Sequence, residues 1–84
     1  MSYRLLLFKK VNLFLKKLDN INKERVEKKL RELKINPRLG KPLIGKLSGL
    51  WSLRIGDYRA LYRIKQDALE VWVIKLGHRK NIYD

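Results

Sequence analysis

Residues 51–64 read WSLRIGDYRALYRI, and apolar and polar side chains alternate along two short runs within them. Gly56 and Asp57 separate the runs, which is typical of a tight turn between antiparallel strands. Successive side chains of a strand point to opposite faces, so one face of this hairpin is predicted to be apolar and buried. The opposite face then carries Ser52, Arg54, Arg59, Leu61 and Arg63. Three arginines on the open face of a small sheet can hold phosphate groups, although the same pattern also suits ordinary solvated residues.

The segments on either side of the hairpin extend this prediction. Gln66 and Asp67 indicate a second turn, and residues 68–76 are a β-branched and aromatic run that predicts a third strand. Residues 37–49 contain two prolines and three glycines. That composition predicts a loop leading into the hairpin.

The first part of the chain combines a strand with an amphipathic helix. Residues 3–7 are short and apolar, which predicts a first strand. From Phe8 to Leu18 the apolar residues recur at spacings of three and four, with lysines between them. This period is typical of a helix that buries one side and exposes a lysine-rich side to solvent.

A second helix follows and completes the predicted architecture. Asn20 or Asn22 is predicted to cap this helix, and Pro37 ends it because the residue before a proline avoids the helical region. Two helices followed by an antiparallel meander favour an α+β fold. The sequence therefore predicts one domain over residues 1–84, with two N-terminal helices packed on a small, mainly antiparallel sheet.

Charge is the strongest compositional signal. The 84 residues include 21 Lys and Arg against 8 Asp and Glu, a formal net charge of +13, and the excess is spread along the chain. Such a surface repels itself, so it favours a polyanionic partner, with nucleic acid first and an acidic protein second. The alternative is that the charge serves only solubility. Cysteine is absent, so disulfides and thiolate metal sites are excluded. The apolar stretches are too short to span a membrane, and we expect a soluble, cytoplasmic protein without a membrane partner.

Two motifs carry a resemblance to a known family. Residues 46–62 read KLSGLWSLRIGDYRALY and residues 74–83 read IKLGHRKNIY. The first resembles the central signature of the RelE/ParE toxin superfamily, and the second is similar to its closing Gly-His-Arg and Tyr. The resemblance implies a microbial ribonuclease-like RelE fold and a toxin of a type II toxin–antitoxin pair. RelE-like members cut mRNA in the ribosomal A site without metal or cofactor, whereas ParE-like members inhibit gyrase; the closing motif favours the RNA-cutting branch.

The resemblance also implies a catalytic set. Cutting RNA without a metal uses the 2′-hydroxyl as nucleophile, and it needs proton transfer and cations for the charge on the phosphate. Arg54, Arg59 and Arg79 match the cationic positions of the family. Tyr83 is the candidate for proton transfer at the 2′-hydroxyl. His78, the single histidine, is a candidate acid or base, or else a phosphate or base contact.

Further residues are expected to bind RNA, and they imply the partners. Lys46 matches the family's loop lysine, and Arg63 and Lys80 add positive charge beside the catalytic set. Ser52 is also expected at the RNA, but it stands where RNA-cutting relatives often carry a lysine, so either Arg54 and a nearby lysine compensate or the activity is weaker or absent. The expected partners are a RelB-like antitoxin and the ribosome with its mRNA and rRNA. A gyrase inhibitor and an RNA-binding module without catalysis remain as alternatives.

Overall fold

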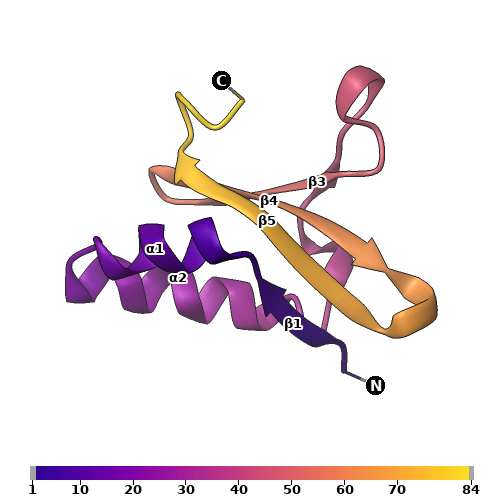
Figure 1. Ribbon diagram of the computed structural model, residues 1–84, viewed down its shortest axis with the longest axis horizontal. Coiled ribbons are helices and arrows are strands. Elements are labelled where there is room, and N and C mark those ends of the chain that lie inside the picture. Colours follow the sequence, from indigo (N-terminus) through magenta and orange to yellow (C-terminus); the bar gives the residue numbers. More distant parts are fainter. Residues whose placement is uncertain (1, 84) are drawn as a thin grey trace.

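The computed structural model describes residues 2–83, in which one five-stranded sheet carries two helices on one of its faces (Figure 1). The strands are β1 (Arg4–Leu7), β2 (Lys41–Pro42), β3 (Trp51–Ile55), β4 (Tyr58–Lys65) and β5 (Glu70–His78). The helices are α1 (Lys9–Lys16) and α2 (Asn20–Glu32), and short 3-10 turns lie at Pro37–Leu39, Gly45–Leu47 and Gln66–Ala68. The predicted α+β class is confirmed.

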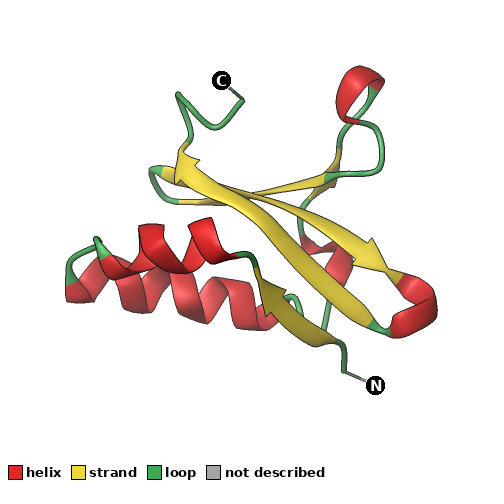
Figure 2. Ribbon diagram, viewed as in Figure 1, coloured by secondary structure: helices red, strands yellow, loops and turns green. Residues whose placement is uncertain are grey.

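The sheet is antiparallel except at one edge. Its strand order is β1-β5-β4-β3-β2, and β1 runs parallel to β5 while the other neighbours are antiparallel. The helices connect β1 to the later strands and pack below the sheet in the view of Figure 2. The segment after β5 and the loop that leads into β3 lie on the other side (Figure 1).

The core fills the space between the helices and the sheet. Side chains from both helices pack against the apolar face of the hairpin. The completely buried residues of this core include Val11, Val26, Leu33 and, from β4, Tyr62. Burying a side chain of this size stabilises the fold by about 1.5–3 kcal/mol, so this layer dominates the stability. Neither helix described within residues 2–83 is long and apolar enough to cross a membrane.

The capping residue of α2 differs from the prediction. The N-cap is Asp19, whose carboxylate accepts a hydrogen bond from the backbone N–H of Asn22 at 3.4 Å and from the Asn22 side chain at 2.8 Å. The prediction of Asn20 or Asn22 as the cap was therefore wrong, because Asn20 already lies inside the helix. The Asn22 side-chain hydrogen bond is the main reason why the pKa of Asp19 is lowered.

A β-bulge in β5 changes which side chains share a face. Tyr62 lies opposite Val73 and Leu61 lies opposite Lys75, so the register skips Ile74. The skipped residue reverses the alternation of β5 from that point. Leu76 therefore joins Val73 on the face covered by the helices, and Gly77 lies on the other face, opposite Arg59.

The predicted loop at 37–49 is more ordered than its composition indicates. It contains β2 and two 3-10 turns, and the buried hydroxyl of Tyr62 ties it to the sheet. That hydroxyl donates to the carbonyl oxygen of Pro37 at 2.7 Å and accepts from the N–H of Gly40 at 2.9 Å. A Cβ at Gly40 would lie 2.4 Å from the carbonyl oxygen of Ser52, so only glycine fits there. Burial raises the pKa of Tyr62 above its ordinary value.

Candidate functional site

The face of the sheet opposite the helices, called here the open face, collects the polar side chains of the hairpin. Residues directly opposite each other on neighbouring strands share a face. Ser52 lies opposite Leu61, and Arg54 lies opposite Arg59. The alternation of residues 51–64 thus predicted correctly which side chains share the open face.

The segment after β5 folds back over part of this face. Ile82 is 1% exposed, and its δ-methyl lies 3.6 Å from where a Cβ of Gly77 would be. Ser52 and Leu61 are only 4% and 5% exposed. These two side chains lie on the face that the alternation predicted, but the fold covers them and leaves them little exposed to solvent.

Ser52 is the centre of a small polar cluster. A guanidinium N–H of Arg59 donates to Ser52 Oγ at 2.8 Å, and the hydroxyl of Tyr83 donates to the same oxygen at 3.4 Å. The second distance is long for two hydroxyls, so Tyr83 is held loosely. Tyr83 is 51% exposed, so an incoming ligand can reach it. We call Ser52, Arg54, Arg59 and Tyr83 the Ser52 cluster.

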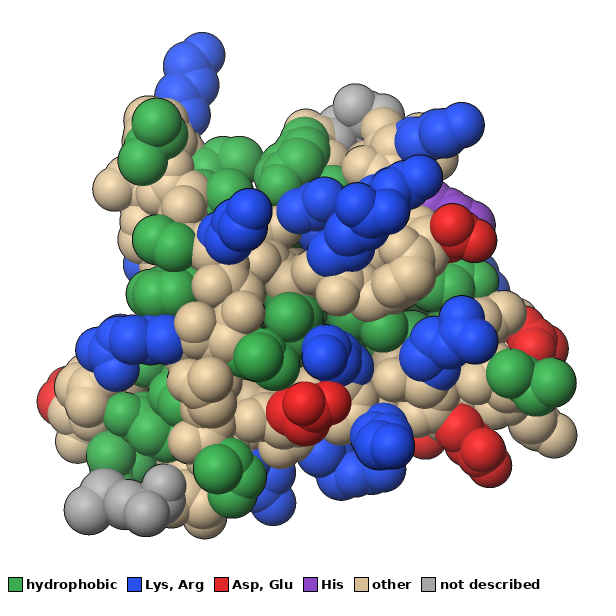
Figure 3. All heavy atoms as spheres, turned by 180° about the vertical axis from the view of Figure 1, so that it is seen from behind, with side chains coloured by type: hydrophobic (Ala, Val, Ile, Leu, Met, Phe, Trp, Pro, Cys, Tyr) green, Lys and Arg blue, Asp and Glu red, His purple; other side chains and the backbone are tan. Residues whose placement is uncertain are grey.

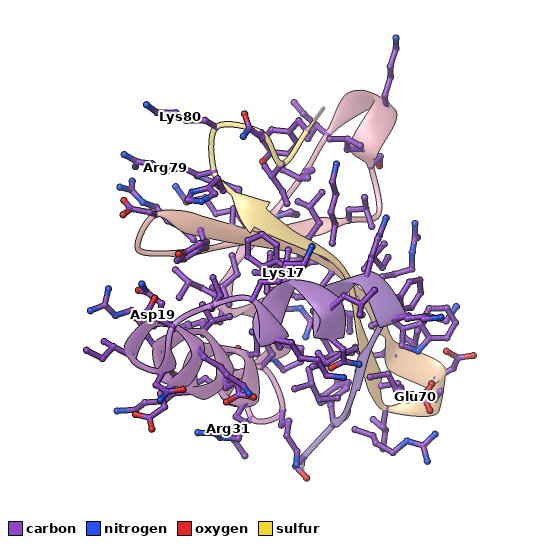
Figure 4. All side chains as sticks on the ribbon, turned by 60° about the vertical axis from the view of Figure 1, so that its left-hand side comes forward. Lys17, Asp19, Arg31, Glu70, Arg79 and Lys80 are labelled. Atoms are coloured by element: carbon purple, nitrogen blue, oxygen red, sulfur yellow. The ribbon has the colours of Figure 1, made fainter. Side chains whose placement is uncertain are left out.

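A second group of charged side chains lies at the end of the sheet, beside the β3–β4 turn. A pocket of about 280 Å³ there is lined by Asp57, His78, Arg79 and Lys80, which we call the turn cluster. The backbone N–H of Arg79 donates to the carbonyl oxygen of Asp57 at 3.0 Å. Arg79 and Lys80 extend outward from the end of β5 in Figure 4.

His78 is turned away from the Ser52 cluster. It lies opposite Tyr58 in the register, and the two rings are 5.0 Å apart between centroids. Tyr58 in turn packs edge-on against Phe14 of α1, so His78 belongs to the side that the helices cover. The bulge at Ile74 causes this, because without it His78 would fall on the open face. The structure brings Arg54, Arg59 and Tyr83 together but not His78.

A cleft opens where the short strand β2 ends. β2 pairs only with Trp51 and Ser52, so within residues 2–83 no strand pairs with residues 53–55 of β3 on that side. The cleft has a volume of about 380 Å³. It is lined by Lys29, Leu39, Gly40, Lys41, Ser52, Leu53, Arg54 and Arg59.

Two lysines of this cleft were missed by sequence reasoning. The helical period places Lys29 on the charged side of the second helix, which suits solvent or rRNA phosphates equally, and Lys41 lay in a predicted loop without any period. The signal that finds Lys41 is its register, since it lies opposite Ser52 and therefore shares the open face.

The remaining predicted RNA contacts lie around the site. Arg63 shares the open face, and its guanidinium lies 3.0 Å from where a Cβ of Gly49 would be. Lys46 is exposed in the 3-10 turn of the loop that rises on the same side as the C-terminal segment (Figure 1). Seen from behind, the molecule shows many more Lys and Arg side chains than Asp and Glu (Figure 3).

Among residues 2–83, the site contains no group of three or more His, Asp or Glu side chains placed to hold a metal ion. The cationic groups of the Ser52 cluster can neutralise a phosphate, and the Tyr83 hydroxyl can exchange a proton with a neighbouring hydroxyl. The arrangement suits the binding of a phosphodiester and proton transfer beside it.

Comparison with known proteins finds similarity to one toxin family and to two individual toxins. A family model described as the ParE toxin of type II toxin–antitoxin systems matches residues 9–83. Toxins RelG and RelE of Mycobacterium tuberculosis are 46% identical over 46 residues and 47% identical over 49 residues. These matches cover 55% and 57% of this chain and 53% and 50% of the relatives, so the chain spans about half the length of the curated relatives it matches.

Solved structures agree over nearly the whole chain. The RelBE2 toxin–antitoxin complex of Mycobacterium tuberculosis matches with a TM-score of 0.85 and 31% identity, over 96% of this chain and 95% of that chain. An archaeal RelE–RelB complex from Pyrococcus horikoshii matches with a TM-score of 0.79 and 25% identity, over 96% and 99%. The isolated E. coli RelE toxin, at a TM-score of 0.77, 23% identity and coverage of 92% and 84%, shows the shared fold alone.

Proposed function

The chain belongs to the ParE toxin family of type II toxin–antitoxin systems, within the RelE/ParE superfamily, and on that premise we propose that it is a ribosome-dependent endoribonuclease. Its substrate in this proposal is mRNA held in the ribosomal A site. The RelE and RelG toxins among its relatives place it on the RelE-like side of the superfamily. A ribosomal target also places its action in the cytoplasm.

The Ser52 cluster is the observation that supports this proposal. Arg54 and Arg59 stand opposite each other on β3 and β4, and Ser52 joins Arg59 to Tyr83. A phosphodiester above this pair of arginines has two guanidinium groups to neutralise it. The Tyr83 hydroxyl stands beside them, within reach of the ribose.

The reaction is a transfer of the phosphodiester to the neighbouring 2′-oxygen. The 2′-oxygen forms a bond to phosphorus, the bond to the 5′-oxygen breaks, and that oxygen takes up a proton. Arg54 and Arg59 stabilise the charge that develops on the phosphate. Tyr83, as the phenolate, takes the proton of the 2′-hydroxyl, and a water molecule gives a proton to the departing 5′-oxygen. The fragments carry a 2′,3′-cyclic phosphate and a 5′-hydroxyl.

Arg79 and His78 take lesser roles in this proposal. Arg79 lies two residues beyond Gly77, the partner of Arg59, and so borders the site as a cation for the RNA backbone. His78 packs on Tyr58 on the other side of the sheet, and we assign it to holding the end of β5. Lys46, Arg63 and Lys80 contribute positive charge to RNA binding.

The test is cleavage of a defined mRNA on programmed ribosomes, with the 3′ ends mapped by primer extension. We expect cuts confined to the A-site codon, and none on the same mRNA without ribosomes. Cleavage of free mRNA at comparable rates would contradict the ribosome-dependent proposal, and intact mRNA on ribosomes would reject the nuclease.

A second candidate function is inhibition of gyrase, which the match to the ParE model favours. It predicts that the protein blocks DNA supercoiling in vitro and leaves ribosome-bound mRNA intact. It also predicts that Tyr83→Phe keeps full toxicity, because no proton transfer is needed. The Ser52 cluster would then be an ordinary basic surface, and an RNA-binding module without catalysis would likewise leave the mRNA uncut.

We further propose a RelB-like antitoxin as the protein partner. Several structures similar to this chain are complexes of a RelE toxin with RelB. The net charge of +13 favours a partner segment rich in Asp and Glu. Such an antitoxin should prevent mRNA cleavage in the ribosome assay when it is added before the ribosomes.

A further inference from the structure

Buried contacts fix the backbone that forms one wall of the cleft at the free edge of β3. The Tyr62 hydroxyl holds Gly40, and Gly40 packs directly on the backbone of Ser52. These contacts set the start of β2, where Lys41 lies opposite Ser52. The backbone of Lys41 is therefore positioned by buried contacts, although its side chain is exposed.

The cleft concentrates positive charge. Its four cations come from four different elements, and among residues 2–83 no acidic side chain lines it. Within residues 2–83, no carboxylate lies within 4 Å of the side-chain nitrogens of Lys41, Arg54 or Arg59, and the fourth cation, Lys29, has only an exposed contact of 3.8 Å with Glu32. Cations gathered without a carboxylate among them repel one another, and a bound anion relieves that repulsion.

Ser52 explains why Lys41 matters here. The Ser52 side chain is nearly buried, carries no charge, and is engaged by Arg59. The positive charge beside Ser52 on the cleft side therefore comes from Lys41, which lies opposite Ser52 on β2. A cation at Lys41 can approach an anion that already contacts Arg54 and Arg59, because all three line one cleft.

We propose that this cleft is a second phosphate-binding subsite, in which Lys41 is the main cation and Lys29 a lesser one. Its ligand is a backbone phosphodiester of single-stranded RNA next to the one held over Arg54 and Arg59. The identity of the ligand as RNA rests on the proposed function, whereas the anion site rests on the cleft alone.

The experiment measures binding of a short 2′-O-methyl oligoribonucleotide, which lacks the 2′-hydroxyl and stays intact, over a series of KCl concentrations. Each phosphate contact on a single strand contributes about 0.7 to the slope of log K against log salt. We expect Lys41→Ala to weaken binding and to reduce the slope by about 0.7, while Lys41→Arg keeps the wild-type slope.

Lys28→Ala is the matched control. It removes the same charge from an exposed position of α2 beside Lys29, but Lys28 does not line the cleft. If Lys41→Ala and Lys28→Ala have the same affinity and the same slope, the subsite is rejected, even if the wild-type protein cuts mRNA on ribosomes. If only Lys41→Ala lowers the slope, the subsite stands, even if no cleavage is observed and the proposed function fails.

Discussion

The Ser52 cluster and the turn cluster are both basic and both involve the end of the chain, but they are held in different ways. Ser52 is almost fully buried and receives hydrogen bonds from Arg59 and Tyr83. In the turn cluster, Arg79 and Lys80 are exposed and extend away from the sheet (Figure 4). Positive charge is thus common to both regions, whereas a guanidinium held by a buried side chain, that of Arg59 on Ser52, belongs to the first.

The difference separates two uses of charge. A preorganised donor stabilises a transition state because it does not have to reorient during the reaction. A flexible exposed cation attracts a polyanion from a distance and contributes mainly to binding. The acidic Asp57 beside Arg79 weakens the local field further. We therefore expect the Ser52 cluster to govern the rate and the turn cluster to govern affinity.

Arg59→Ala should have the largest effect. Loss of one preorganised donor lowers turnover by about 10²–10³-fold. The rate of A-site cleavage under single-turnover conditions measures this effect, with circular dichroism to check the fold. Lys28→Ala is the control for a simple loss of charge. A rate for Arg59→Ala within the range of that control would remove the distinction between the two clusters.

Tyr83→Phe should follow. It removes the hydroxyl near Ser52 and keeps the ring. Proton transfer by a positioned group contributes upward of about 10²-fold, and we expect a loss near that lower limit because water can replace a loosely held hydroxyl. The loss should appear in kcat with KM nearly unchanged. An unchanged kcat would exclude Tyr83 from proton transfer.

Tyr62→Phe tests how much the buried hydroxyl that binds Pro37 and Gly40 stabilises the fold. The substitution leaves the Pro37 carbonyl and the Gly40 N–H without their partner, which costs about 1–3 kcal/mol. Because burial raises the pKa of Tyr62, ionisation of its hydroxyl opposes folding. The stabilisation of the fold by the neutral hydroxyl is therefore complete below a pH of about 10 and is lost as the pH rises further.

Urea denaturation at neutral and alkaline pH measures the cost of losing these hydrogen bonds and its dependence on the ionisation of Tyr62. The stability difference between wild type and Tyr62→Phe should be largest at neutral pH and should shrink above a pH of about 10. A difference that stays constant through that range would show that Tyr62 ionises as readily in the folded protein as in the unfolded chain.

His78→Ala should have the smallest effect on cleavage. Its ring contact with Tyr58 contributes about 0.5–1.5 kcal/mol to stability, which a denaturant titration can detect. The cleavage rate should change by less than about threefold. A tenfold change would correspond to about 1.4 kcal/mol in the activation free energy. A loss comparable to that of Arg59→Ala would return His78 to the catalytic set.

Local patterns predicted the hairpin and the helices because those elements follow simple periods. Arg54 and Arg59 were assigned to one face by alternation alone, and the register confirms it. The bulge at Ile74 carries no such signal, because it depends on how β5 must fit both the core and its neighbour. His78 was grouped with the catalytic set from its motif and its ionisable ring, and neither feature indicates that the bulge turns it toward the helices.

The short strand β2 was missed for a similar reason. Two residues show no alternation, and Pro42 is unusual in a strand because it lacks a backbone N–H. Its position is set by Tyr62 and Gly40, whose contacts link parts of the chain that are distant in sequence. The lysine that this strand brings to the cleft therefore emerges only from the three-dimensional structure.

The most direct test of the account uses ribosomes programmed with an mRNA that carries a single 2′-deoxynucleotide in the A-site codon. We predict that the all-ribose mRNA is cut there and leaves a 2′,3′-cyclic phosphate, detected by mass spectrometry, whereas the deoxy position is not cut. Cleavage at the deoxy position, or fragments ending in a 3′-hydroxyl, would contradict attack by the 2′-oxygen at the Ser52 cluster.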